Sequence, residues 1–234
     1  MKKIFALLPM VVAFALCGCG NDKEKESEGE KGSNLEFTEE QAKAKVRELA
    51  QTEGFEITFK YTSSDSESNE VSETTLGQKD GYTWWASSGS QSMWKETETT
   101  IVTYNYDENS GKYSVAYTYN KAELQETYGE AYSKMYSLDI YATFLYMGNM
   151  YDGYEGYHKV KDLTYVGRSA TQYDLRESNG LAYVTATVII DKATGITLYW
   201  GVAGADVQGN SGSASYQVTS FKTGSEVSVP AIQE

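Results

Sequence analysis

The first regular pattern of polar and apolar residues in the chain has the period of a helix. Thr38 and Gln41 form a capping box, in which each side chain bonds a backbone N–H at the start of a helix. Gly54 is a C-terminal stop. The apolar residues on one helical stripe between them are Ala42, Val46, Leu49 and Ala50. This pattern predicts one short amphipathic helix that packs against a sheet.

From Phe55 onward the apolar residues alternate with a period of two, which is typical of strands with one buried and one wet face. The predicted strands are 55–61, 71–76, 82–86, 92–95, 99–106, 113–119, 164–167, 170–177, 181–191, 196–202 and 215–222. Asp107–Gly111, Asn179-Gly180 and Asp191–Gly195 have the composition of hairpin loops, because Asn, Asp and Gly tolerate the backbone angles of tight turns.

A second helical region interrupts the strands. Asn120 with Glu123 gives another capping signal, and the helical spacing continues to Met150 before a turn-rich loop at 152–156. The predicted order is therefore helix, β-meander, helical insertion and β-meander, in a single domain over residues 35–234. The fold class that this order predicts is α+β, with predominantly antiparallel strands.

The N-terminal residues predict export and attachment to a lipid. Lys2 and Lys3 precede an apolar run, 4–16, whose length of about 13 residues suits a signal peptide and is short of the roughly 20 that cross a bilayer. The run ends in Leu16-Cys17-Gly18-Cys19, which resembles the bacterial lipobox. We therefore expect residues 1–18 to be a signal peptide and Cys19 to be the lipidated N-terminus. Plain secretory cleavage, an uncleaved anchor, and Cys17 as the acceptor are the alternatives.

Residues 19–34 then form an acidic segment without a large apolar residue, which predicts a flexible linker. Its acidic residues resemble the surface-export signals of some Bacteroidetes lipoproteins, but we interpret the segment as an ordinary charged linker. The formal net charge is −13, and loss of Lys2 and Lys3 makes it −15 because two positive charges go. Such a surface argues against nucleic acid as a partner, so we expect contact with the membrane through the lipid. The predicted location is the bacterial cell envelope, at the outer membrane or cell surface.

Short hairpin motifs recur in both meanders: Val166 to Tyr173, Val188 to Ile196 with its Asp-x-x-Thr-Gly turn, Gly77 to Trp84, Tyr104 to Asp107, and Phe221 to Gly224. These motifs resemble the LolA/LolB-like superfamily. The resemblance implies an unclosed antiparallel half-barrel over a few helices, with a cavity for lipid or lipoprotein acyl chains. A β-sandwich with a helical insertion is the alternative fold. Arg168 is the one candidate ligand-binding residue within these motifs, but we interpret it as an ordinary strand or edge arginine.

The residue types that catalysis or metal binding needs are scarce. His158 is the only histidine, and no Gly-x-Ser-x-Gly motif supplies a nucleophile. The segment from Asp107 resembles the start of a calcium loop, but Lys112 and Thr118 stand where an EF-hand needs glycine and glutamate. We therefore predict non-covalent binding, with no enzymatic activity and no cofactor.

Aromatic residues are abundant, with 20 tyrosines and 4 tryptophans. Trp84 and Trp85 are adjacent in a predicted strand, so they should point to opposite faces. The first hypothesis is an internal pocket of several hundred Å3 that binds an acyl chain, lined by Tyr, Trp, Leu and Met. The second is a surface module that binds glycan or protein through exposed aromatics. The predicted ligand-binding residues are Phe59, Tyr82, Trp84, Trp94, Tyr104, Tyr117, Tyr183 and Trp200.

Overall fold

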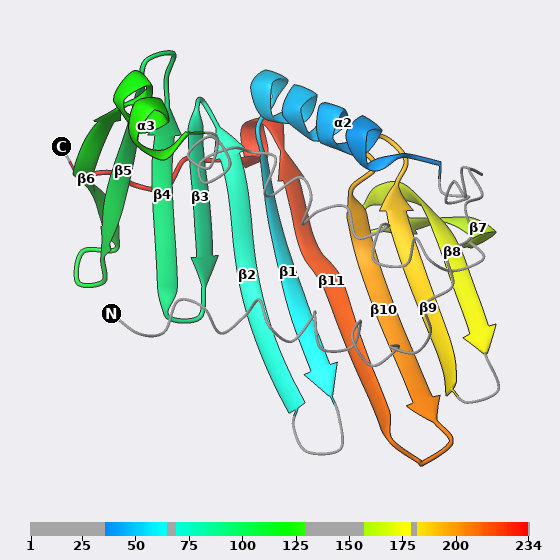
Figure 1. Ribbon diagram of the computed structural model, residues 1–234. Helices are drawn as coiled ribbons and strands as arrows, with labels where there is room; N and C mark the ends of the chain where they lie inside the picture. The colour runs from blue at the N-terminus through cyan, green and yellow to red at the C-terminus, as the bar shows by residue number, and fades with distance from the viewer. Residues whose placement is uncertain (1–35, 65–68, 130–156, 179–181, 234) are drawn as a thin grey trace. The chain divides into compact units, whose positions relative to one another are not determined.

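Eleven antiparallel strands form a single sheet in the computed structural model, which describes residues 36–64, 69–129, 157–178 and 182–233 (Figure 1). The elements are α2 (Glu39–Thr52), β1 (Phe55–Ser64), β2 (Asn69–Lys79), β3 (Tyr82–Ser87), β4 (Ser90–Glu96), β5 (Thr100–Asp107), β6 (Lys112–Asn120), α3 (Lys121–Tyr128), β7 (His158–Tyr165), β8 (Arg168–Ser178), β9 (Ala182–Asp191), β10 (Thr197–Asp206), β11 (Ser211–Thr223) and the 3-10 turn η2 (Gly224–Glu226).

Two meanders meet in the middle of the sheet. The strand order is β6-β5-β4-β3-β2-β1-β11-β10-β9-β8-β7, so every neighbouring pair is consecutive in sequence except β1 and β11. The edge strands of this order are β6 and β7, and the sheet is unclosed. The predicted antiparallel half-barrel over helices is confirmed. The alternative β-sandwich is wrong, because the described strands all belong to one sheet rather than two.

Helix α2 lies where the sequence predicts it and covers one face of the sheet. The Thr38 hydroxyl accepts from Gln41 N at 3.3 Å, and the Gln41 amide oxygen accepts from Thr38 N at 2.9 Å, which confirms the capping box. Gly54, at a φ of 74°, ends the helix by donating its N–H to the Leu49 carbonyl. The helix packs its apolar stripe against Phe55, Ile57 and other buried residues of β1, β2 and β8–β11. We call this side of the sheet the helix face.

The opposite face is covered near β3–β6 by the C-terminal segment, and we call it the tail face. Trp84, Met93, Tyr104 and Tyr113 form a buried cluster with Val227, which follows η2, and Val229 and Ile232 pack against it. The segment then adds to the edge of β6, where Tyr113 N donates to Ala231 O at 2.8 Å. This end of the sheet is therefore apolar on both faces, since Trp94 and Ile101 pack with Leu124 of α3 on the helix face.

Most predicted strands agree with the structure to within a few residues, but the strand predicted at 164–167 is wrong. β7 begins at His158 and ends at Tyr165, and Val166 and Gly167 form a two-residue turn with φ angles of 44° and 79°. Positive φ at both turn positions matches the right-handed twist of the paired strands. Valine is a strong strand former, so its position in the left-handed region hid the turn from the sequence pattern.

Two of the three predicted hairpin loops are confirmed. Gly111 N donates to Asp107 O, and Gly195 N donates to Asp191 O, both at 2.9 Å. The predicted turn at Asn179-Gly180 lies outside the described residues, although β8 and β9 pair on either side of it. The signal peptide, Cys19, the linker, the helical region beyond residue 129 and the loop at 152–156 also lie outside them.

Candidate ligand-binding site

A row of mostly aromatic side chains crosses five strands on the helix face. Backbone register places Tyr61 of β1 opposite Tyr216 of β11, and then Trp200 of β10, Val188 of β9 and Tyr173 of β8 in succession. Residues directly opposite each other in antiparallel strands share a face, so these side chains lie side by side. We call this row the aromatic strip. All its members are buried except Tyr61, which is half-buried.

Ring contacts extend the strip toward β3. The Phe59 and Tyr216 rings have centroids 4.8 Å apart, and Phe59 meets Trp85 edge-on at 6.1 Å. Burial raises the pKa of the Tyr216 and Tyr173 phenols above the ordinary 10.0. Burial also raises the pKa of Tyr61, and the nearby Glu70 carboxylate adds to the effect. The phenols of the strip are therefore neutral at physiological pH, and the surface they form is uncharged.

The helix face becomes less buried with distance from α2. Phe55, Ile57 and Leu198 are fully buried close to the helix. Val202 and Ala214, farther along β10 and β11, are partly buried and pack against the same apolar cluster. The aromatic strip therefore continues into an apolar surface that is only half covered.

The eight residues predicted to bind a ligand lie in different parts of the sheet. Phe59 and Trp200 belong to the buried cluster that also holds Tyr216, Val188 and Tyr173 of the aromatic strip. The residues that lie elsewhere are Tyr82, Trp84 and Tyr104 in the tail-face cluster, Trp94 beside α3, and Tyr117 and Tyr183, which are 64% and 54% exposed. The structure thus brings Phe59 and Trp200 together in one cluster, and Tyr82, Trp84 and Tyr104 together in another on the opposite face. A ligand-binding role for any of them stays a prediction.

The sequence pattern missed Tyr216, Tyr61 and Tyr173 as neighbours of Phe59 and Trp200. Their alternation with polar residues indicates a buried face, and that signal is present in the sequence. The register between β1 and β11 decides which aromatics meet, however, and it depends on strands separated by most of the domain.

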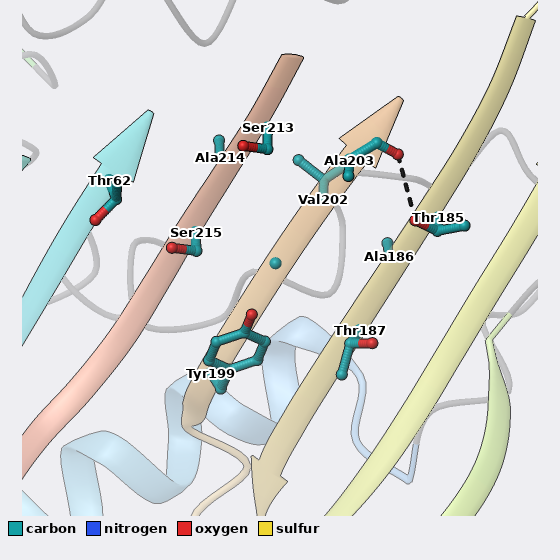
Figure 2. A pocket seen from close by; sticks show the side chains of 11 residues that line it. Thr62, Thr185, Ala186, Thr187, Tyr199, Val202, Ala203, Ser213, Ala214 and Ser215 are labelled. Carbon is teal, nitrogen blue, oxygen red and sulfur yellow. Dashed lines mark hydrogen bonds between the residues drawn. The ribbon is translucent and has the colours of Figure 1, made fainter. Parts of the chain in front are cut away.

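The tail face of β1, β11, β10 and β9 carries an open trough of 360 Å3 (Figure 2). We call it the hydroxyl trough, because its lining includes Thr62, Thr185, Thr187, Tyr199, Ser213 and Ser215. A Cβ at Gly201 would overlap the Tyr199 side chain, so that ring lies over the glycine. The trough contains none of the eight predicted residues. Its lining of hydroxyls and small side chains differs from the expected one of Tyr, Trp, Leu and Met.

Arg168 has a structural partner at the Asp-x-x-Thr-Gly turn. Its guanidinium donates to both carboxylate oxygens of the buried Asp191, at 2.8 and 2.9 Å, and lies 4.1 Å from the Phe221 ring centroid. Thr194 donates its backbone N–H and its hydroxyl to the same carboxylate. Gly195 closes the turn against Phe37, where a Cβ would crowd the ring. Arg168 at the start of β8 thus compensates a buried charge, and the motif has a structural explanation.

The described residues hold no cluster of three or more His, Cys, Asp or Glu side chains that could bind a metal ion. His158 begins β7 and is exposed. Among the residues that the structure describes, no helix is long and apolar enough to cross a membrane.

Among known proteins, only solved structures show similarity to this chain. No protein-family model and no curated protein matches the chain. A chain from the MucA/MucB complex of Pseudomonas aeruginosa is 14% identical, with a TM-score of 0.30 over 81% of this chain and 58% of that one. This protein therefore spans less than two thirds of that chain's length.

Two further solved structures cover most of their own length. A candidate outer membrane lipoprotein-sorting protein domain from Vibrio parahaemolyticus is 10% identical, with a TM-score of 0.25 over 82% of this chain and 95% of that one. A LolA superfamily protein from Nitrosomonas europaea is 8% identical, with a TM-score of 0.23 over 78% and 93%. This superfamily is the one that the hairpin motifs resemble. Likeness of this degree transfers no function between chains.

Proposed function

We propose that the protein is a bacterial envelope lipoprotein whose domain binds an acyl chain without covalent chemistry. In this proposal residues 1–18 are a signal peptide, Cys19 carries the lipid, residues 19–34 are a linker, and residues 35–234 are the binding domain. The lipobox-like sequence Leu16-Cys17-Gly18-Cys19 supports the anchor. The half-covered apolar surface that continues from the aromatic strip supports the ligand, and this observation carries the proposal.

An acyl chain requires a long, uncharged surface and offers no hydrogen bonds in return. The half-buried Tyr61, Ala214 and Val202 provide such a surface beside the buried strip, across the neighbouring strands β1, β11 and β10. Strands lie roughly 4.8 Å apart, so these three strands present a surface roughly 10 Å wide. Each methylene removed from water contributes about 0.8 kcal/mol. The half-buried side chains of Tyr61, Val202 and Ala214 mark where the ligand would enter.

Two adjacent residues of β11 allow a matched test of the ligand site. By alternation along β11 the Ala214 side chain shares the helix face with Tyr216, although Ala214 also borders the hydroxyl trough. The Ser213 side chain lies on the tail face in that trough. We expect Ala214→Phe to fill the entry and to lower binding of cis-parinaric acid at least fivefold, while Ser213→Phe leaves it unchanged. Fluorescence titration measures the affinity, and native mass spectrometry of the purified protein detects co-purified lipid. Equal binding by both variants, or no binding of the probe by the unaltered protein, would show that the strip is not a lipid site.

The anchor is tested separately from the ligand site. Cells that express the protein should incorporate radiolabelled palmitate into it, and Cys19→Ala should abolish the label and release the protein from the membrane fraction. Cys17→Ala is the matched control, and it should leave the label in place. Label that survives Cys19→Ala, or that is lost with Cys17→Ala, contradicts the assignment of Cys19.

A further inference from the structure

Strands β4 and β5 separate away from the turn that joins them and leave a cleft between the start of β4 and the end of β5. They pair only over Met93–Glu96 and Ile101–Tyr104, although β4 begins at Ser90 and β5 continues to Asp107. A pocket of 500 Å3 lies at this divergence, and its lining consists of Gly89, Ser90, Gln91, Asn105, Tyr106 and Glu108. We call it the β4–β5 cleft. The ladder between the two strands stops short of it, so backbone N–H and C=O groups at its walls have no partner across the gap within the described residues.

The side chains of the cleft are polar groups with unused hydrogen-bonding capacity. Gln91 accepts a hydrogen bond from the Tyr113 hydroxyl at 3.3 Å through its amide oxygen, which leaves its NH2 group for a ligand. The side chains of Asn105 and Glu108 have no hydrogen-bonding partner among the described residues. Tyr106 contributes an aromatic ring to the same lining. These groups all border the same cleft. Alternation along the strands places Gln91 and Tyr106 on the tail face and Asn105 on the helix face, so the cleft offers polar groups from both sides of the sheet.

The walls of the cleft are held in place by local contacts. Tyr106 packs on Tyr113 with ring centroids 5.1 Å apart. The adjoining loop is fixed by Asp107, whose carboxylate accepts from Asn109 N and from the Ser110 hydroxyl, both at 2.9 Å. Preorganised groups lose little conformational entropy when a ligand binds, so a small polar ligand can gain affinity here.

From this arrangement we propose that the β4–β5 cleft binds a neutral oligosaccharide. Sugar hydroxyls both donate and accept, which suits the Gln91 and Asn105 amides, the Glu108 carboxylate and the open backbone groups. The ring of Tyr106 offers an apolar surface for the C–H face of a sugar. The lining contains no Lys or Arg, and the protein has a net charge of −13, so anionic ligands are disfavoured. An acyl chain is disfavoured as well, because five of the six lining residues are polar or glycine.

This site is separate from the proposed lipid site, and its test is independent of it. Isothermal titration calorimetry of the full chain with maltohexaose, cellohexaose and chitohexaose should detect binding to at least one of them, with a Kd below 10 mM. Gln91→Ala and Asn105→Ala should each weaken that binding by about threefold to tenfold, the effect of losing one or two hydrogen bonds. Gln208→Ala, in the exposed turn between β10 and β11, is the matched control and should bind like the unaltered protein.

Gln91 and Asn105 are exposed, and circular dichroism verifies that each variant keeps the fold. Saturation-transfer difference NMR should show the bound sugar's C–H protons closest to the protein, with the signal reduced in Tyr106→Leu. The proposal is overturned if none of the three hexasaccharides binds, or if Gln91→Ala and Asn105→Ala bind as tightly as Gln208→Ala. It is also overturned if the cleft instead takes an extended peptide by backbone pairing, which a peptide of alternating Thr and Val residues would reveal in the same titration.

Discussion

Replacing Arg168 by alanine would leave the Asp191 carboxylate buried without its cation. Loss of one partner from a buried ion pair costs roughly 3–5 kcal/mol. Asp191 is 1% exposed and Arg168 is 21% exposed, and Thr194 still donates two hydrogen bonds to the carboxylate. We therefore expect the lower end of that range, about 3 kcal/mol. In a domain of this size each kcal/mol lowers Tm by roughly 2–4 °C, so Tm should fall by about 6–12 °C.

The companion substitution Asp191→Asn tests whether the cost of Arg168→Ala comes from the buried carboxylate charge. An asparagine retains an acceptor for Thr194 and leaves the guanidinium at a position where water can reach it, so it should cost only about 1–2 kcal/mol. The destabilisation of the double variant should be smaller than the sum of the two single variants by more than 1 kcal/mol. The reason is that Asp191→Asn removes the buried carboxylate charge that Arg168→Ala alone leaves without a cation. Urea denaturation followed by tryptophan fluorescence gives all three values. Asp191→Asn proving costlier than Arg168→Ala, or additive effects, would refute the reasoning.

Three further substitutions and conditions have defined outcomes. Gly77→Ala should destabilise by about 1–3 kcal/mol, because a Cβ there would overlap the Trp84 ring, and a thermal shift measures it. Thr38→Ala should cost about 1 kcal/mol through loss of the N-cap of α2, and Thr38→Ser should restore the stability. Hydrogen bonds from Lys192 and then Lys159 hold the pKa of Asp162 far below its ordinary 3.8. Their stabilisation is present above pH 3.8 and is lost as the pH falls toward the folded pKa, so Asp162→Asn should flatten the acid side of a stability-pH curve.

Features encoded within a few residues could be predicted from the sequence. The capping box at Thr38 and the loop at Asp191–Gly195 depend on neighbours in the chain, and the structure confirms both. The turn at Val166 is also a local feature. Valine favours strands, however, and Val166 has a positive φ, so the alternation pattern wrongly assigned it to a strand.

Features that depend on distant segments could not be predicted. Trp84 and Trp85 point to opposite faces as expected, but Trp84 is buried and Trp85 is half-buried, because both faces carry packed apolar groups. The sequence contains no signal that the C-terminal segment returns to cover Trp84. The neighbours of Phe59 likewise follow from a register that joins the two ends of the domain, so the aromatic strip emerges only in three dimensions.

The pairing of β1 with β11 also governs the order in which the protein can assemble. Thr58 and Thr219 meet across this junction although 161 positions separate them in the chain. During synthesis the first meander is complete before β11 exists. The edge of β1 that pairs with β11 therefore stays unpaired until the last strand has been made. An unpaired strand edge can pair with other incompletely folded chains and so promote aggregation. Bringing β1 and β11 together closes a long loop of chain, which is slow. Newly made copies should therefore depend on a holding chaperone until β11 arrives, and truncation before Ser211 should yield aggregates rather than a smaller folded protein.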